Sequence, residues 1–176
     1  MKMFFILLFI SIIPANAAQN YDAVPNRGTY ANITLSPTTQ AAAYAAGTTI
    51  GGLLSFTGVP LPGVGGVIQS AQATFVSGVN PSPDLILFSA NPAASTVTDK
   101  VALSIATADV PKIIRILHLT DCALTNTSTI MVCGDAGASK MFNNSITGTI
   151  YGVLVVRTAV TLGSVADVVV SLGLMQ

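Results

Sequence analysis

The chain has 176 residues, of which 51% are hydrophobic, so it is long enough for one domain with a substantial core and too apolar to be disordered by default. It carries only 7 Lys plus Arg and 7 acids, all of them Asp, so Thr, Ser, Asn, Ala and Gly must cover most of its surface. This near-zero charge favours self-association, and the lack of a basic face argues against binding to nucleic acid.

Residues 1–17 have the pattern of an export signal. Lys2 provides the positive start, residues 4–13 form an apolar run, and small residues lead to a predicted cleavage between Ala17 and Ala18. An apolar run of this length is too short to span a bilayer, so membrane contact is expected to be transient and to involve only this leader. The alternative is an uncleaved hydrophobic arm that packs within an assembly.

Residues 18–30 are polar, lack periodicity and contain Pro25 and Gly28, so they are predicted to form an extended arm. The rest of the chain, 31–176, alternates between strand-like runs and turns rich in Gly and Pro, which predicts a single β domain. Its first run, at 31–36, alternates apolar and polar residues as a half-buried strand does.

The next two predicted strands enclose a loop. Residues 48–57 form the first strand, in which Gly51 and Gly52 indicate a bulge that curves the sheet. Residues 58–66 are rich in Pro and Gly and are predicted to be a loop. The GVGG in this loop lacks the strand, GxGxxG and helix context of a dinucleotide site. A second strand is predicted at 67–76.

Two later runs are apolar on both faces and are predicted to be central strands, DLILFSA at 84–90 and IYGVLVV at 150–156. Between them, ATADVPKIIR at 106–115 is the best helical candidate, with Pro111 in its first turn. The final predicted strand, 167–175, alternates in burial. Its predicted inward residues are Val168, Val170, Leu172 and Leu174, and its predicted outward residues are Asp167, Ser171 and Gly173.

Cys122 and Cys133 flank a predicted hairpin whose polar tip is at 125–129. In the oxidising compartment that an export signal implies, a cross-strand disulfide is expected, and it would contribute about 3 kcal/mol in the chain-entropy model. The alternative is a pair of buried thiols. With no His or third Cys beside them, the two cysteines do not form a zinc site.

Catalytic and metal-binding constellations are not evident. His118 is the only histidine, and Asp121 lies three residues later, where a strand directs its side chain to the opposite face. The aspartates are scattered singly, and residues 135–137 indicate a turn rather than a cation site. A glycosidase is disfavoured because the chain has no Glu and no Trp. The sequence therefore predicts a non-enzymatic protein with no catalytic residues, no metal and no cofactor.

About eight short strands and one short helix predict an all-β fold, an antiparallel β-sandwich or jelly roll. Five motifs follow one another along the chain: YAAGTTIGGLLSF at 44–56, GGVIQSAQATF at 65–75, PDLILFSANPAASTVTDKVAL at 83–103, ATADVPKII at 106–114, and GTIYGVLVVRTAVTLGSVADVVVSLGLMQ at 148–176. With these motifs, the chain resembles a family of small β-rich structural proteins of tailed bacteriophages and prophages. The resemblance implies a virion-associated, capsid-associated or head-decorating subunit whose partners are copies of itself and the major capsid protein.

Three functions remain in competition. The first is a non-enzymatic structural protein of the virion. The second is an exported bacterial or viral surface-binding module, secreted or periplasmic after cleavage, whose loops such as 58–66 contact a ligand. The leader and the Cys pair favour export, because virion proteins assembled in the cytoplasm do not normally need a cleavable signal. The third, a secreted hydrolase, lacks a catalytic constellation.

Overall fold

The structure, a computed structural model, describes residues 30–59, 65–125, 129–135, 140–142 and 148–176. The predicted leader, the cleavage between Ala17 and Ala18, and the arm up to residue 29 lie outside the described residues. So do residues 60–64 of the predicted loop and 126–128 of the predicted hairpin tip.

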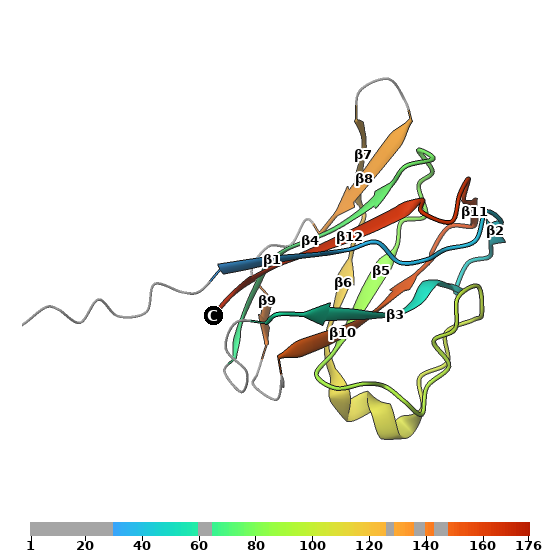
Figure 1. Ribbon diagram of the computed structural model, residues 1–176. Coiled ribbons are helices and arrows are strands. Elements are labelled where there is room, and N and C mark those ends of the chain that lie inside the picture. Colours follow the sequence, from blue (N-terminus) through green and yellow to red (C-terminus); the bar gives the residue numbers. More distant parts are fainter. Residues whose placement is uncertain (1–29, 60–64, 126–128, 136–139, 143–147) are drawn as a thin grey trace, which may run out of the picture.

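Two antiparallel sheets form the body of the protein (Figure 1). The larger has six strands, in the order β1 (Tyr30–Leu35), β12 (Val168–Met175), β4 (Gly66–Phe75), β8 (Ile130–Gly134) and β7 (Asp121–Thr125), with β9 (Lys140–Phe142) also paired to β4. The smaller has four strands, in the order β3 (Thr49–Thr57), β10 (Thr149–Val155), β5 (Asp84–Phe88) and β6 (Ile113–His118). A separate two-stranded ribbon is formed by β2 (Ala43–Tyr44) and β11 (Val160–Thr161).

The predicted all-β, sandwich-like class is confirmed, but the described residues alone form twelve strands rather than about eight. Three of the strands are very short, because β2 and β11 have 2 residues each and β9 has 3. Such short strands show no alternation in sequence, and β2 and β9 pair with segments far away in the chain, β11 and β4. Only the folded chain reveals them.

The two strands predicted to be central, β5 and β10, do lie inside the smaller sheet, and all five residues of β5 are buried. One face of β5 packs on the larger sheet through Leu85 and Leu87. On its other face, Ile86 and Phe88 belong to a second cluster that also contains Val153 and Val155. The residues that cover this second cluster include Val97, Leu103 and Ile105, from the long connection between β5 and β6, and Ile113, at the start of β6.

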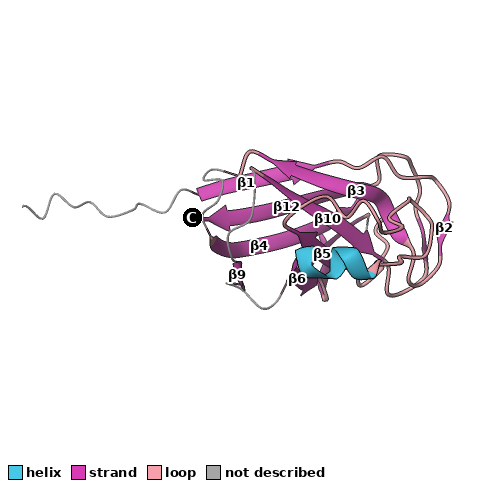
Figure 2. Cartoon of the chain, turned by 90° about the horizontal axis from the view of Figure 1, so that it is seen from below, coloured by secondary structure: helices cyan, strands magenta, loops and turns pink. Residues whose placement is uncertain are grey.

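A short 3-10 helix, η1 (Thr107–Lys112), lies at the end of the molecule opposite the β7–β8 hairpin (Figure 1) and beside β5 and β6 (Figure 2). It falls within the predicted helical segment 106–115 and contains Pro111. It is shorter than that segment because β6 begins at Ile113.

The predicted bulge in β3 is confirmed. Gly51 and Gly52 have φ values of 71° and 68°, a region that favours glycine. These two glycines have no partner in the register with β10. Leu53 lies opposite Val153, and the next pair is Ile50 opposite Leu154. A Cβ atom on Gly51 would lie 2.4 Å from the Cβ atom of Pro37, so the bulge also permits a close approach of two segments.

The predicted inward face of β12 is confirmed, since Val168, Val170, Leu172 and Leu174 are each 0% exposed. The prediction that Asp167 points outward is wrong, because this residue is 1% exposed and its carboxylate accepts hydrogen bonds from two neighbouring loops. Gly173 does lie on the outer face but is buried, because Ser70 and Tyr30 leave no room for a side chain there.

Contacts between strands of different sheets close two sides of the body. On one side β1 contacts β3, and on the other β6 contacts β9. There, Arg115 Nε donates a hydrogen bond of 3.0 Å to the carbonyl of Met141. In contrast, β7 ends the larger sheet in a hairpin with β8 that projects from the body (Figure 1).

Packing around Gly152 in the middle of β10 leads to a stability prediction. A Cβ atom here would lie 2.8 Å from Phe56 Cε2 and 3.3 Å from Leu85 Cδ1. Gly152→Ala is therefore expected to lower the free energy of unfolding by about 1–3 kcal/mol, measured by urea denaturation. The control is Gly134→Ala, whose Cβ atom meets nothing closer than Ala71 O at 3.8 Å. Equal effects of the two substitutions would contradict this account of the core.

Candidate functional site

Most of the carboxylates in the described chain face inward. Asp84, Asp109 and Asp167 are at most 1% exposed, and Asp99 is half-buried. A buried carboxylate is tolerated only when charged or N–H and O–H partners compensate for its lost hydration. Each of the four has such partners, and together they determine where the charge of this protein lies.

Asp84 begins β5 and forms a trio with His118 and Arg157. His118 is its cross-strand partner at the end of β6, and Arg157 follows β10. Asp84 Oδ1 lies 2.7 Å from His118 Nδ1, and Oδ2 accepts hydrogen bonds from Nε of Arg157 at 2.6 Å and from its Nη2. The Asp84 side chain is 2% exposed, whereas those of His118 and Arg157 are 67% and 54% exposed. The two bases thus cover a buried acid.

An Asp–His pair is part of many hydrolytic sites, but such sites also need a nucleophile bonded to the His. Within the part of the chain that the structure describes, Asp84 is the only side chain hydrogen-bonded to His118. The hydroxyl of the nearby Ser82 is not hydrogen-bonded to His118. Both the N–H and the Oγ of Ser82 donate hydrogen bonds to Asn80 Oδ1, at 2.9 and 3.2 Å. What the geometry shows is a buried carboxylate whose lost hydration is compensated by two basic side chains.

The turn before Asp84 holds the trio in place. Ser82 has φ of 43°, in the left-handed region that is strained for a side-chain-bearing residue. The Asn80 side chain stabilises this conformation, and the carbonyl of Pro81 accepts hydrogen bonds from the N–H groups of Arg157 and Thr158 at 3.0 and 2.9 Å. The backbone therefore brings Arg157 to the carboxylate.

The three-residue spacing of His118 and Asp121 on a strand predicts that the two side chains point to opposite faces. The structure agrees, because His118 pairs with Asp84 and not with Asp121. Asp84 was missed as the partner, since it lies 34 residues away and only the register of β5 and β6 brings the two together. The one available signal was that Asp84 opens a strand that is otherwise entirely apolar.

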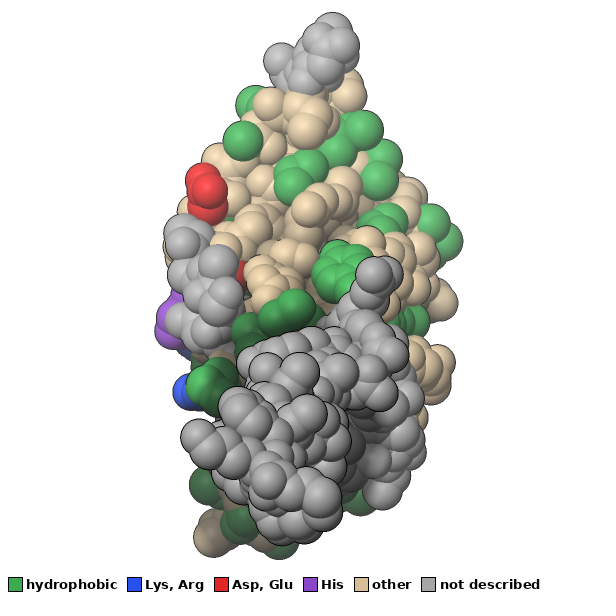
Figure 3. All heavy atoms as spheres, turned by 90° about the vertical axis from the view of Figure 1, so that its left-hand side faces the viewer, with side chains coloured by type: hydrophobic (Ala, Val, Ile, Leu, Met, Phe, Trp, Pro, Cys, Tyr) green, Lys and Arg blue, Asp and Glu red, His purple; other side chains and the backbone are tan. Residues whose placement is uncertain are grey.

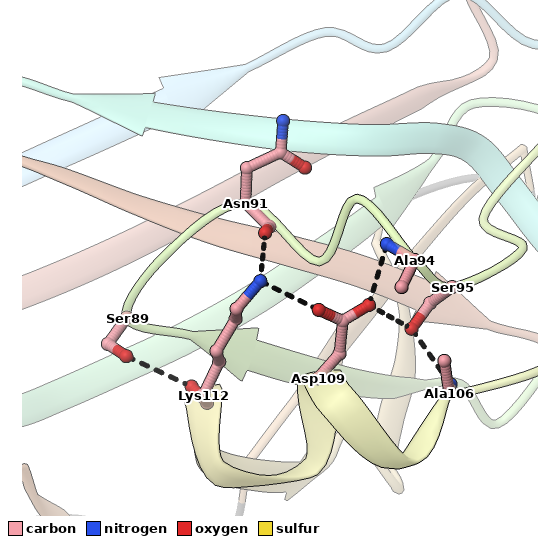
Figure 4. Close-up of polar contacts among 7 residues, drawn as sticks. All are labelled: Ser89, Asn91, Ala94, Ser95, Ala106, Asp109 and Lys112. Carbon is pink, nitrogen blue, oxygen red and sulfur yellow. Dashed lines mark hydrogen bonds and ion pairs between the residues drawn. The ribbon is translucent and has the colours of Figure 1, made fainter.

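Asp109, in η1, holds the connection between β5 and β6 (Figure 4). Its Oδ2 accepts hydrogen bonds from the N–H of Ala94 at 3.0 Å and from Ser95 Oγ at 2.6 Å. Its Oδ1 pairs with Lys112 Nζ at 2.7 Å, and Lys112 also donates to the carbonyl of Asn91. The bonds from Lys112 and Ser95 lower the pKa of Asp109, against the opposing effect of burial.

Asp99 links the bulge of β3 to the ribbon strand β2. Its Oδ1 accepts a hydrogen bond of 2.7 Å from the N–H of Gly51, and the Tyr44 hydroxyl donates to both carboxylate oxygens at 3.0–3.1 Å. Gln40 Nε2 adds a bond of 3.1 Å. Burial, and to a lesser extent Asp99, raise the pKa of Tyr44 to about 12, although the N–H of Gln40 acts in the opposite direction.

Asp167 joins the loop after β4 to the loop before β12. Its carboxylate accepts hydrogen bonds from the N–H and Oγ of Ser77, at 2.6 and 2.5 Å, and from the N–H of Gly163 at 2.7 Å. These contacts explain why a residue adjacent to an alternating strand is buried. The aspartates therefore serve as fixed acceptors for loop backbone.

As a result, the surface carries little charge. Lys112 and Arg157 are paired with buried acids, which leaves Lys100, Arg115 and Asp121 among the exposed charged residues that the structure describes. On the face that Figure 3 shows, the described residues present mainly apolar and uncharged polar atoms, and acidic and basic side chains are few.

The larger sheet has the most uniform surface. The strands β1, β12, β4 and β8 contain no charged residue at all. Its outer face, as the term is used from here on, consists of the outward side chains of these strands, which include the polar Asn32, Thr34, Ser70, Gln72, Thr74 and Ser171 and the apolar Tyr30, Val132, Val169 and Met175. Thr34 and Ser171 are hydrogen-bonded across β1 and β12 at 3.1 Å, and Gln72 donates to Thr74 at 3.3 Å. This face is mostly polar and uncharged, and its one acid in the described strands, Asp121 of β7, lies at its margin opposite Gly134.

The predicted cysteine pairing agrees with the structure. Cys122 of β7 lies directly opposite Cys133 of β8, and a disulfide joins them. Cys133 is buried in the main core, and Cys122 packs against it. The bond therefore connects the projecting hairpin to the body.

Other features offer little chemistry. A depression of about 400 Å³ between η1, β6 and β9 is lined in part by Lys112, Arg115 and Met141, and both cations are already engaged there. The described residues contain no group of three His, Cys or Asp side chains placed to hold a metal ion. No described helix is long and apolar enough to cross a membrane.

Comparison of the chain with protein-family models, curated proteins and solved structures finds no significant match in any of the three.

The Asp109 network predicts an acid sensitivity. The folded state lowers the pKa of Asp109, so its contribution to stability is present above the unfolded pKa of about 4 and is lost as the pH falls through the folded value. Asp109→Asn is expected to lower the melting temperature at pH 7 and to flatten the fall of the melting temperature as the pH drops below about 4. The matched control is Asp121→Asn, at an exposed aspartate, which should change neither the melting temperature at pH 7 nor its dependence on pH. If the melting temperature of Asp109→Asn depended on pH as that of the wild type does, Asp109 would not be the source of the acid sensitivity.

The Tyr44 site predicts an alkaline sensitivity. Because the folded pKa is about 12, above the unfolded value of about 10, the stabilisation is complete below pH 10 and is lost as the pH rises toward 12. Tyr44→Phe should remove this dependence and cost about 1–3 kcal/mol at pH 7 through the lost bond to Asp99. Denaturation curves from pH 8 to 12 measure both effects. Tyr151→Phe, at a half-buried tyrosine, is the control, and a Tyr44→Phe curve that coincides with it would count against the site.

Proposed function

We propose that the protein is a non-enzymatic structural subunit of a virion, capsid-associated or head-decorating, that acts through contacts with copies of itself and with the capsid lattice. The observation that carries the proposal is the outer face of the larger sheet, on strands without any charged residue. Such a face can be buried against a partner with little cost of ion desolvation.

The motif resemblance supports the same function. The motif at 44–56 includes β3, the motif at 83–103 includes β5, and the motif at 148–176 includes β10 and β12. These are framework strands that make up the two sheets. The resemblance thus concerns the whole scaffold, as is suitable for a protein whose function is to present surfaces in an assembly.

An exported surface-binding module is the second candidate, and the disulfide favours it. Disulfides persist mainly in oxidising compartments, and Cys122 and Cys133 are joined in the structure. In that case the protein would be secreted or periplasmic after cleavage at Ala17 and Ala18, and it would bind its ligand through loops.

A fractionation experiment separates the two functions. Particles and cell-free supernatant from a producing culture are separated by density-gradient centrifugation, and the amount and N-terminus of the protein are determined by mass spectrometry. A virion subunit is expected to sediment with the particles and to remain after a wash in 1 M salt, because its contacts are not ionic. Free protein that begins at Ala18, with none on the particles, would overturn the proposal in favour of the exported module.

A pair of variants tests the outer face itself. Gln72 is exposed on the central strand β4, so Gln72→Lys places a charge on this face without touching the core. It is expected to reduce the amount of particle-bound protein at least tenfold. Thr158→Lys, at an exposed position away from the two sheets, is the matched control and should bind as the wild type does. Equal binding of all three proteins would remove the outer face from the proposed function.

A further inference from the structure

The strand β7 is an uncovered edge. It ends the larger sheet, and the described residues place no strand on its far side. Ala123, Leu124 and Thr125 are exposed, Leu124 by 52%. Proteins usually protect such an edge with Lys, Pro or a bulge, because its free N–H and C=O groups pair readily with another strand. None of these occurs in β7, whose register with β8 continues without a shift.

The alternation of the hairpin shows which backbone groups are free. The Cα atoms of Cys122 and Cys133 are 4.0 Å apart, as in a pair of opposed residues that are not hydrogen-bonded to each other. The N–H and C=O groups of Cys122 and Leu124 therefore point away from β8, toward the open edge. Those of Asp121, Ala123 and Thr125 point toward β8.

We propose that β7 pairs antiparallel with β7 of a second copy of this chain, about a two-fold axis at Ala123. This inference rests on the self-association in the proposed function and assigns it to one strand. With this centre, all five residues of β7 face residues of β7 in the second copy, and Asp121 of one copy lies opposite Thr125 of the other. Cys122 and Leu124 then exchange backbone hydrogen bonds across the interface, about four in all.

Charge favours a second copy as the occupant. The two-fold arrangement offsets the two Asp121 carboxylates by four residues along the strands, or roughly 13 Å, which exceeds the screening length of about 8 Å at physiological salt. The chain has a formal net charge of 0, so two copies approach without repulsion. The disulfide adds preorganisation, because it holds β7 in place as a template before pairing.

The first test removes one outward donor. Leu124→Pro deletes the N–H that points to the open edge and leaves the pairing of β7 with β8 intact. The full chain is expected to be a dimer in sedimentation equilibrium, and Leu124→Pro is expected to raise its dissociation constant about 10- to 100-fold. Leu124→Ala, which keeps the N–H, is the matched control and should remain dimeric. Wild-type protein that is monomeric, or a Leu124→Pro protein that dimerises as the wild type does, would overturn the proposal.

A cross-link tests the register and does not depend on the tolerance of β7 for proline. Across the proposed axis Ala123 faces its own copy, at the separation of about 4.5 Å that suits a disulfide. Ala123→Cys is therefore expected to form a covalent dimer under mild oxidation, with the link located by peptide mapping. Ser70→Cys, on the outer face of the same sheet, is the control and should stay monomeric on a nonreducing gel. Cross-linking of Ser70→Cys alone would mean that the copies meet face to face and would overturn the proposal.

The outcomes also separate this inference from the proposed function. A monomeric Leu124→Pro protein that still binds particles confirms the edge as the self-association surface and leaves the virion function standing. A wild-type dimer that Leu124→Pro dissociates, with no protein on the particles, confirms the edge and removes the virion function.

Discussion

The rest of the structure depends on one constraint. Each carboxylate buried inside the protein must be matched by N–H, O–H or basic partners. In a chain whose 7 acids are all Asp, the buried Asp84, Asp109 and Asp167 each accept hydrogen bonds from segments far away in sequence. An unpaired carboxylate in these positions would cost several kcal/mol, so each one permits a single arrangement of its loops. Long connections rich in Gly and Pro thereby acquire defined conformations.

The surface of the larger sheet carries little charge for a different reason. The strands β1, β12, β4 and β8 contain no charged residue, so their outer face is mainly Thr, Ser, Asn and Gln with a few apolar side chains. The sides of the body are closed by contacts of β1 with β3 and of β6 with β9, which leaves β7 as the exposed edge in the described part of the larger sheet. The uncharged face and the open edge are the two surfaces on which the proposed contacts with other proteins rest.

Sequence patterns predicted what depends on local alternation. The all-β class, the central strands β5 and β10, the inward face of β12 and the glycine bulge all follow from side-chain periodicity or from φ values that favour glycine. The patterns missed what depends on pairing across the chain. The ribbon of β2 and β11 and the contact of Asp84 with His118 arise from register between distant segments, and Asp167 is buried by loops rather than by its own strand.

The pairing of the first and last strands of the described chain has a mechanical consequence. Tyr30 lies opposite Met175, and β1 and β12 run antiparallel, so a pull applied through these two ends loads their hydrogen bonds one after another. The pair opens as a zipper, which needs little force, whereas strands pulled in shear must break many bonds together. Tension transmitted through the ends would therefore peel away β1 and leave the disulfide-linked hairpin, at the far side of the sheet, in place.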